Sequence, residues 1–199
     1  MGKSLGLGCL VLVLVGVLAL GAWAAGTYNR LNEADQKVTA AWAQVENQYQ
    51  RRMDLIPNLV ETVKGAASFE KGTLEGVIQA RASATQMKFD ANSIKDPAVF
   101  EQFQKVQDQL GGALARLLVA VERYPELKAV QNFRDLQVQL EGTENRIAVS
   151  RLDFNSASLV YNTLRKSFPT VIVASFAGFK ERPYFRAAEG AAKPPAVKF

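Results

Sequence analysis

The amino-acid sequence predicts an all-α fold, in which an N-terminal transmembrane helix precedes an elongated antiparallel helical bundle. Three observations predict this fold class. Residues 5–25 carry no charge and, at about 1.5 Å per residue, they span the roughly 30 Å hydrocarbon core of a bilayer. Apolar residues then recur at spacings of three and four, the period of an amphipathic helix. The last of these repeats continues over five heptads, and a helix of that length cannot fold back into a compact globule.

The first segment, residues 1–26, has three interpretations. It is a membrane anchor, a cleaved signal peptide with Lys3 as its basic start and Ala22-Trp23-Ala24 as its cleavage site, or a lipoprotein leader with Cys9 as the acceptor. Its length favours the anchor, because the apolar region of a signal peptide has only about 7–15 residues. Cys9 lies at the start of the apolar run, too early for a lipid acceptor. We predict a single-pass protein of the inner (cytoplasmic) membrane, with the lipid bilayer as its first partner.

Composition limits the chemistry of the chain. Cys9 is the only cysteine and histidine is absent, which excludes intrachain disulfides, histidine relays and histidine–metal sites. No glycine-rich phosphate loop appears. We therefore predict a protein that is not an enzyme, with no cofactor and no metal. From Val160 onward seven cations and two carboxylates give 7 − 2 = +5, the whole net charge. The rest of the domain has no basic face, so nucleic acid is not an expected partner.

The bundle domain, residues 27–186, begins with a helix whose apolar positions run from Leu31 to Val63. Pro57 lies inside it and is a candidate kink, because proline removes a backbone hydrogen bond at a cost of roughly 3 kcal/mol. Helical spacing continues to about Met87. A second helix starts at Asp96-Pro97, where aspartate caps the helix and proline occupies its first position.

The third helix is predicted from Glu126 to Ser167, about 63 Å if unbroken. Two seams of a coiled-coil heptad pattern run along it, and they could be satisfied within one chain or between chains of a homo-oligomer. Aromatic and aliphatic residues seven apart form the first seam: Phe133, Leu140, Ile147, Phe154, Tyr161 and Phe168. Smaller residues form the second: Leu136, Thr143, Ser150, Ala157 and Leu164.

Charged residues on the core side of two helices predict a polar layer. Arg52 follows Val45 by seven residues, and Glu144 lies between two residues of the first seam. An arginine fork binds a carboxylate bidentately, so such a layer would fix helix register, or it would form a ligand site. The alternative is that the charges on both helices are solvated and no layer forms. The candidate residues are Arg51, Arg52, Asp54, Glu141, Glu144 and Asn145.

After Phe168-Pro169, a short apolar run is followed by aromatic residues interleaved with cations. This pattern is typical of a segment that docks onto the bundle or lies in the membrane interface. The candidate membrane-surface contacts are Phe176, Phe179, Lys180, Arg182, Tyr184, Phe185 and Arg186. Residues 187–199 are predicted to be a disordered tail.

These motifs together resemble the LemA family over about residues 26–186. The resemblance is carried by Tyr28-Asn29-x-Leu31, Trp42-x-x-Val45-Glu46, the run from Arg51 to Val60, Leu140-x-x-Thr143-Glu144-Asn145-x-Ile147, and Tyr161-Asn162. It implies a bacterial single-pass membrane protein with an elongated helical bundle. It also implies partners such as membrane proteases and quality-control proteins. A related branch of the family is implicated in magnetosome membrane biogenesis, so the resemblance implies scaffolding or membrane organisation. Lys3 with the N-terminus and Arg30 with Lys37 balance across the anchor, so charge leaves open the side on which the bundle lies.

Three functional hypotheses follow. The first is a membrane-anchored helical scaffold or adaptor, linked to membrane-protein quality control or envelope organisation. The second is a membrane-remodelling or anionic-lipid-binding protein that acts through its basic aromatic C-terminal segment. The third is a ligand-binding helical bundle that uses the layer around Arg52.

Overall fold

The computed structural model describes residues 2–65, 70–87 and 93–186, and every regular element within them is helical. The predicted tail, residues 187–199, lies outside the described residues. The elements are α1 (Gly2–Lys64), α2 (Lys71–Gln86), the 3-10 turn η1 (Ser93–Lys95), α3 (Pro97–Val121), α4 (Pro125–Ala129), α5 (Gln131–Lys166) and α6 (Thr170–Phe176).

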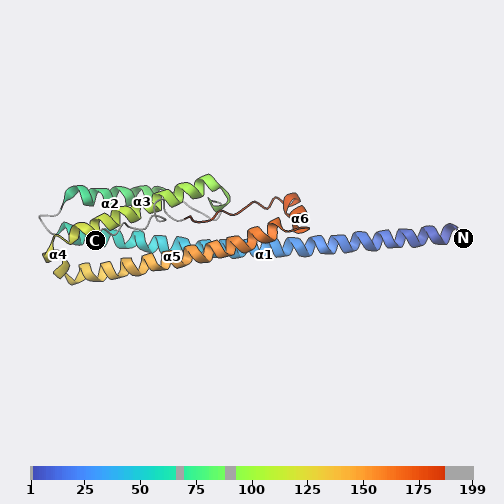
Figure 1. Cartoon of the computed structure of the whole chain (residues 1–199), viewed down its shortest axis with the longest axis horizontal. Helices are drawn as coiled ribbons and strands as arrows, with labels where there is room; N and C mark the ends of the chain where they lie inside the picture. The colour runs from blue at the N-terminus through green and yellow to red at the C-terminus, as the bar shows by residue number, and fades with distance from the viewer. Residues whose placement is uncertain (1, 66–69, 88–92, 187–199) are drawn as a thin grey trace, which may run out of the picture.

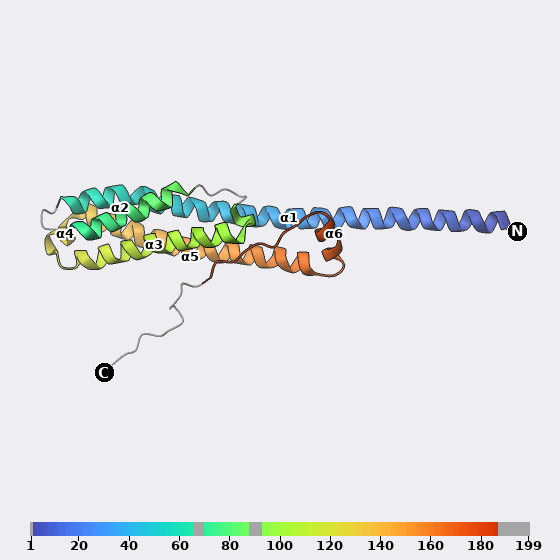
Figure 2. The ribbon, with the colours of Figure 1, turned by 90° about the horizontal axis from the view of Figure 1, so that it is seen from above.

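The predicted all-α fold is confirmed: an elongated bundle follows an apolar N-terminal helix. The antiparallel helices α1 and α5 lie side by side along the whole bundle, and the α2–α3 hairpin covers them at the end far from the N-terminus (Figure 1). Figure 2 shows α1 continuing beyond the bundle as a single rod. Mean hydropathy reaches 2.2 in this projecting part, so among the described helices α1 alone is long and apolar enough to cross a membrane.

Helix α1 has 63 residues, about 95 Å at 1.5 Å per residue, and it continues through Pro57 without interruption. A proline at this position has no N–H for the carbonyl of Met53, four residues earlier. Arg81 of α2 replaces the missing donor, since its Nε donates to the Met53 oxygen at 3.3 Å. The proline therefore opens a backbone acceptor through which α2 docks onto α1, and the kink stays a prediction.

Two predicted helix boundaries are wrong. The first helix does not reach Met87, because the chain leaves α1 after Lys64 and folds back as α2. The third helix is divided at Val130, whose backbone is extended (φ −71°, ψ 121°). The division lets α4 cross the end of the bundle, where Leu127 is buried, before α5 turns along its length.

The first predicted seam of α5 packs inside the chain, with its first five residues buried. Phe168 is the exception at 83% exposed, because α5 ends at Lys166 and the heptad geometry ends with it. The core falls into two clusters. An aliphatic cluster around Leu117 lies at the far end, and an aromatic cluster around Trp42 lies nearer the apolar end of α1.

Candidate functional site

A buried arginine joins three helices between the two core clusters. Arg52 is only 2% exposed. Its Nη1 donates to Glu144 Oε1 of α5 at 2.6 Å, and its Nη2 donates to the side-chain and backbone oxygens of Gln107 of α3, at 2.6 and 3.1 Å. The structure therefore brings Arg52 and Glu144 together as the sequence predicts. We call Arg52, Gln107 and Glu144 the Arg52 layer.

The other four predicted members lie outside this layer. Arg51, Asp54, Glu141 and Asn145 are exposed on the bundle surface. Asp54 and Glu141 accept hydrogen bonds from glutamines on their own helices, at 2.7 and 3.0 Å. Each helical residue advances about 100°, so positions one or two residues from a core-facing side chain turn toward solvent.

Gln107 is the member of the layer that sequence reasoning missed. It is 2% exposed and lies four residues after Phe103 and three before Leu110, on the apolar face of α3. A polar residue at such a position needs a buried partner, because an unsatisfied amide costs free energy. A polar residue on an otherwise apolar helix face is the sequence signal that could have identified Gln107.

Arg52→Met is expected to lower the free energy of unfolding by about 1–3 kcal/mol, because the buried Gln107 oxygens lose their donor. The Glu144 side chain is half exposed, so water can replace the hydrogen bond that it loses from Arg52. The double variant Arg52→Met/Gln107→Leu is expected to recover most of the loss, since it leaves no unpaired amide side chain. Urea denaturation of the full chain in detergent, followed by circular dichroism, measures both. A double variant as unstable as the single one would contradict this account.

A second polar cluster lies one helical turn nearer the apolar end of α1. Arg151 of α5 donates through Nε to the Tyr49 hydroxyl at 2.6 Å and through Nη2 to Asp108 at 3.1 Å. Burial raises the pKa of Tyr49, so its hydroxyl stays protonated at neutral pH. The guanidinium carbons of Arg52 and Arg151 lie 5.0 and 5.6 Å from the Tyr49 ring centroid. Both cations are thus bound within the chain.

The C-terminal segment, residues 177–186, runs back along α5 and enters the aromatic core. Phe185 is 8% exposed, and its ring centroid lies 4.8 Å from Phe100, 5.5 Å from Phe154 and 6.3 Å from Trp42. The segment is therefore part of the bundle.

Two asparagines of α5 hold this segment by its backbone. Asn155 exchanges a pair of hydrogen bonds with Phe185, and Asn162 exchanges a pair with Arg182, all between 2.8 and 3.1 Å. The asparagines are seven residues apart on a helix, about 10.5 Å. Their partners are three residues apart on extended chain, about 10 Å. In the sequence each asparagine follows an aromatic residue, Phe154 or Tyr161. This repeat matches one heptad of helix to three residues of extended chain.

A buried ion pair ties the same segment to α1. The Arg182 side chain is 4% exposed and the Asp35 side chain 17% exposed. Arg182 donates to Asp35 Oδ1 through both Nε, at 2.8 Å, and Nη2. The Tyr161 hydroxyl donates to the Lys180 carbonyl at 2.8 Å nearby. Helices α1 and α5 thus both bind the segment.

These contacts correct the predicted set of membrane-surface residues. Arg182 and Phe185 are buried in the bundle, because α1 and α5 offer a carboxylate and an aromatic pocket for them. Phe179 is half-buried against Tyr28, at 5.5 Å between ring centroids. Lys180, Tyr184 and Arg186 keep exposed side chains on the bundle surface, and Phe176 is 91% exposed at the end of α6.

The outer face of α5 carries apolar side chains that stay largely exposed in the described chain. Four of them are 58–68% exposed: Val138, Val149, Leu152 and Leu159. With Asn145, Ser156 and Thr163 they follow spacings of three, four and seven, which place them on one stripe of the helix. We call this set the α5 outer face. It is a third seam, in addition to the two that face the bundle interior.

Among the described residues, no three histidine, cysteine, aspartate or glutamate side chains gather closely enough to hold a metal ion. A shallow groove of about 330 Å³ runs beside the Arg52 layer, between α5 and the C-terminal segment, and Glu144, Arg151 and Arg186 are among its lining residues. Arg151 and Glu144 both already bind other side chains of the bundle.

The chain is similar in sequence to three magnetosome proteins, to two of them over most of its length. The chain is 27% identical over 193 residues to the magnetosome proteins MamQ 1 and MamQ 2 of Paramagnetospirillum magneticum, covering 89% of this chain and 71% of each relative. It is 35% identical over 75 residues to the magnetosome protein MamQ of Magnetospirillum gryphiswaldense, covering 38% of this chain and 28% of that protein. The model of the LemA family matches residues 41–199. This match covers the bundle from residue 41 onward and includes the Arg52 layer, both asparagines and the α5 outer face. The chain therefore belongs to the LemA family.

Proposed function

We propose that this protein is a membrane-anchored, non-enzymatic scaffold that pairs with a second copy of itself through the α5 outer face. The observation that carries the proposal is this exposed apolar stripe on a helix that lies alongside α1. A scaffold of paired bundles would organise a patch of the inner membrane. The membrane-protease partner that the family resemblance implies stays a prediction.

Retention of the anchor is supported by contacts around the alternative cleavage site. Helix α6 lies beside Leu20, Trp23 and Ala24, with which it lines one apolar groove. Cleavage after Ala24 would remove one wall of this groove and cut α1 in the middle of an unbroken helix. The projecting part of α1 is almost entirely exposed, as a helix surrounded by lipid must be.

A second copy fits the α5 outer face because a shared membrane aligns the two chains. Both bundles leave the bilayer in the same direction, so their α5 helices are parallel and at the same height. A twofold axis along the membrane normal then places each residue of the stripe opposite its own copy. In this register Glu141 of one chain lies beside Arg146 of the other, at the flanking positions where coiled coils place opposite charges.

Disulfide cross-linking in native membranes tests the pairing. In a Cys9→Ala background, Leu152→Cys is expected to form a disulfide-linked dimer on mild oxidation, because paired stripe positions approach within the roughly 7 Å between Cα atoms that a disulfide allows. Val119→Cys is the matched control, since Val119 is 71% exposed on α3 and lies outside the stripe.

The Glu141–Arg146 pair beside the stripe gives an independent check that the two α5 helices pair in this register. Glu141→Arg is expected to slow cross-linking at position 152, and Glu141→Arg/Arg146→Glu is expected to restore it. Cross-linking at position 152 that is no faster than at position 119 would overturn the pairing. So would a cysteine at 152 that reacts only with a different protein, which would point to a heterologous partner.

A further inference from the structure

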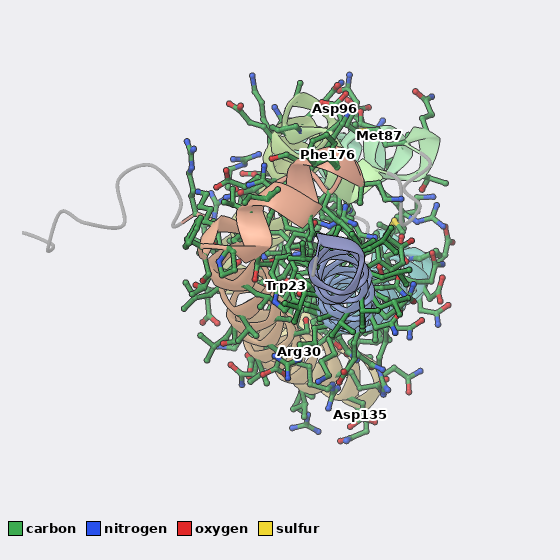
Figure 3. All side chains as sticks on the ribbon, turned by 90° about the vertical axis from the view of Figure 1, so that its right-hand side faces the viewer. Trp23, Arg30, Met87, Asp96, Asp135 and Phe176 are labelled. Atoms are coloured by element: carbon green, nitrogen blue, oxygen red, sulfur yellow. The ribbon has the colours of Figure 1, made fainter. Side chains whose placement is uncertain are left out.

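The end of the bundle that faces the apolar part of α1 carries a cluster of exposed aromatic and aliphatic side chains. Phe168 is 83% exposed, Ile172 46% and Phe176 91%. All three lie on α6 or on the turn that leads into it. Viewed from the N-terminal side, α6 crosses the end of the bundle beside α1, with Phe176 at its end and Trp23 on α1 (Figure 3).

The position of α6 along α1 fixes its depth in a bilayer. An apolar groove of about 510 Å³ lies between α6 and three residues of α1, Leu20, Trp23 and Ala24. These three residues belong to the last turns of the uncharged stretch, which ends at Ala25. From Leu20 to Ala25 is about 7.5 Å along the helix. Interfacial helices embed about 5–10 Å into the boundary between headgroups and acyl chains. An α1 that spans the membrane thus holds α6 at the depth of that boundary.

Two serine hydroxyls, one on α6 and one just before it, are satisfied in a way that suits this depth. The Ser175 hydroxyl donates to the Val171 carbonyl at 2.8 Å, and the Ser167 hydroxyl donates to the Thr163 carbonyl at 2.7 Å. Neither hydroxyl is left without an acceptor in the apolar layer. Ala174, on the opposite side of α6, is 2% exposed and packs onto the bundle. One face of α6 is thereby held by protein while its aromatic face points away.

Cations follow immediately on the bundle side of this layer. Arg30 lies five residues beyond the uncharged stretch, and Lys180 lies four residues beyond α6, both with exposed side chains. Cations close to the surface are attracted to anionic headgroups, and tryptophan is enriched at the same interface. Apolar side chains, tryptophan and cations thus occur in the order in which a bilayer presents acyl chains, interface and headgroups.

We infer that Phe168, Ile172 and Phe176 form a membrane foot, which embeds in the leaflet that α1 leaves and clamps the bundle against the bilayer. The foot rests on the proposed membrane anchor. Its occupant is the lipid interface, and it differs from the predicted basic aromatic site in that Arg182 and Phe185 take no part in it. The foot fixes the depth of the bundle and resists its tilting.

Depth-dependent fluorescence quenching tests the foot on the full chain. The Cys9→Ala protein is reconstituted into phosphatidylcholine–phosphatidylglycerol vesicles that contain a lipid spin-labelled near the headgroup end of its acyl chain. A fluorophore on Ser175→Cys, an exposed position on α6, is expected to be quenched by this lipid and protected from aqueous iodide. A fluorophore on Val119→Cys, at the far end of the bundle, is expected to show the reverse.

Two further variants distinguish embedding of the foot from membrane insertion of the anchor. A label on Leu12→Cys reports the anchor alone and is expected to be quenched by lipid spin-labelled deeper in the acyl chain. Phe168→Asp/Phe176→Asp in the Ser175→Cys chain is expected to abolish lipid quenching at 175 while leaving it at position 12. Lipid quenching at 12 with none at 175 in the parent chain overturns the foot, and its absence at both positions overturns the anchor as well.

Discussion

Replacing Trp42 with alanine is expected to lower the free energy of unfolding by about 3–5 kcal/mol, the usual cost of removing a large aromatic side chain from a core. Trp42 is 1% exposed, and Phe100, Phe103 and Phe154 surround it, with ring centroids 5.1–5.8 Å from its own. These rings come from α3 and α5, and Phe185 adds one from the C-terminal segment. The variant therefore removes contacts that α1 makes with α3, α5 and the C-terminal segment at the same time.

Trp42→Phe is expected to be much milder. The Trp42 Nε1 is buried and has no acceptor in the described chain, so phenylalanine removes an unsatisfied donor while keeping most of the apolar contact. Urea denaturation followed by circular dichroism compares the two variants with Trp23→Ala, which removes the other, 40% exposed, tryptophan. An unfolding midpoint that moves equally for Trp42→Ala and Trp23→Ala would show that the aromatic core does not hold the bundle together.

Asp35→Ala is expected to be the second most damaging change, at about 3–5 kcal/mol, because it leaves the Arg182 guanidinium buried without its carboxylate. The chain can escape this cost by releasing the C-terminal segment into water. Hydrogen exchange then reports the release directly, since the backbone N–H groups of Arg182 and Phe185 donate to Asn162 and Asn155. Both amides are expected to lose their protection in this variant.

Removing both charges is expected to reverse much of this effect. Asp35→Leu/Arg182→Leu leaves no buried ion, and apolar replacement of a buried ion pair is often neutral or stabilising. Asp135→Ala is a suitable surface control, because Asp135 is an exposed carboxylate on α5. Unchanged exchange of the two amides in Asp35→Ala would mean that the asparagines alone hold the segment.

Local patterns predicted the parts of this structure that depend on a single helix. The first seam of α5 repeats every seven residues, so its burial follows from helix geometry. Arg52 on the core side of α1 and Glu144 between seam positions were enough to predict their contact. In each case the signal is the core-facing side of a helix, which can be identified for each helix separately, and burial of that side is the dominant favourable term.

The missed features depend on pairs of distant residues. The break at Val130 has no proline or glycine to mark it, and it exists because the chain must cross the end of the bundle. Arg81 satisfies the carbonyl that Pro57 leaves free, which no local pattern reveals. The docking of Phe185 needs Asn155 thirty residues away, an aromatic pocket from three helices and the matched rise of helix and extended chain.

If α1 spans the membrane as we propose, its unbroken helix makes the protein a lever whose pivot lies at the bilayer surface. About 39 residues separate Ala25 from Lys64, which is a rigid arm of about 59 Å. Transmembrane helices tilt by about 20° on average, and the tilt follows bilayer thickness. Such a tilt would carry the far end of the bundle sideways by about 20 Å. Small changes in membrane thickness would therefore become large displacements at the tip, unless the foot and the paired α5 helices brace the arm upright.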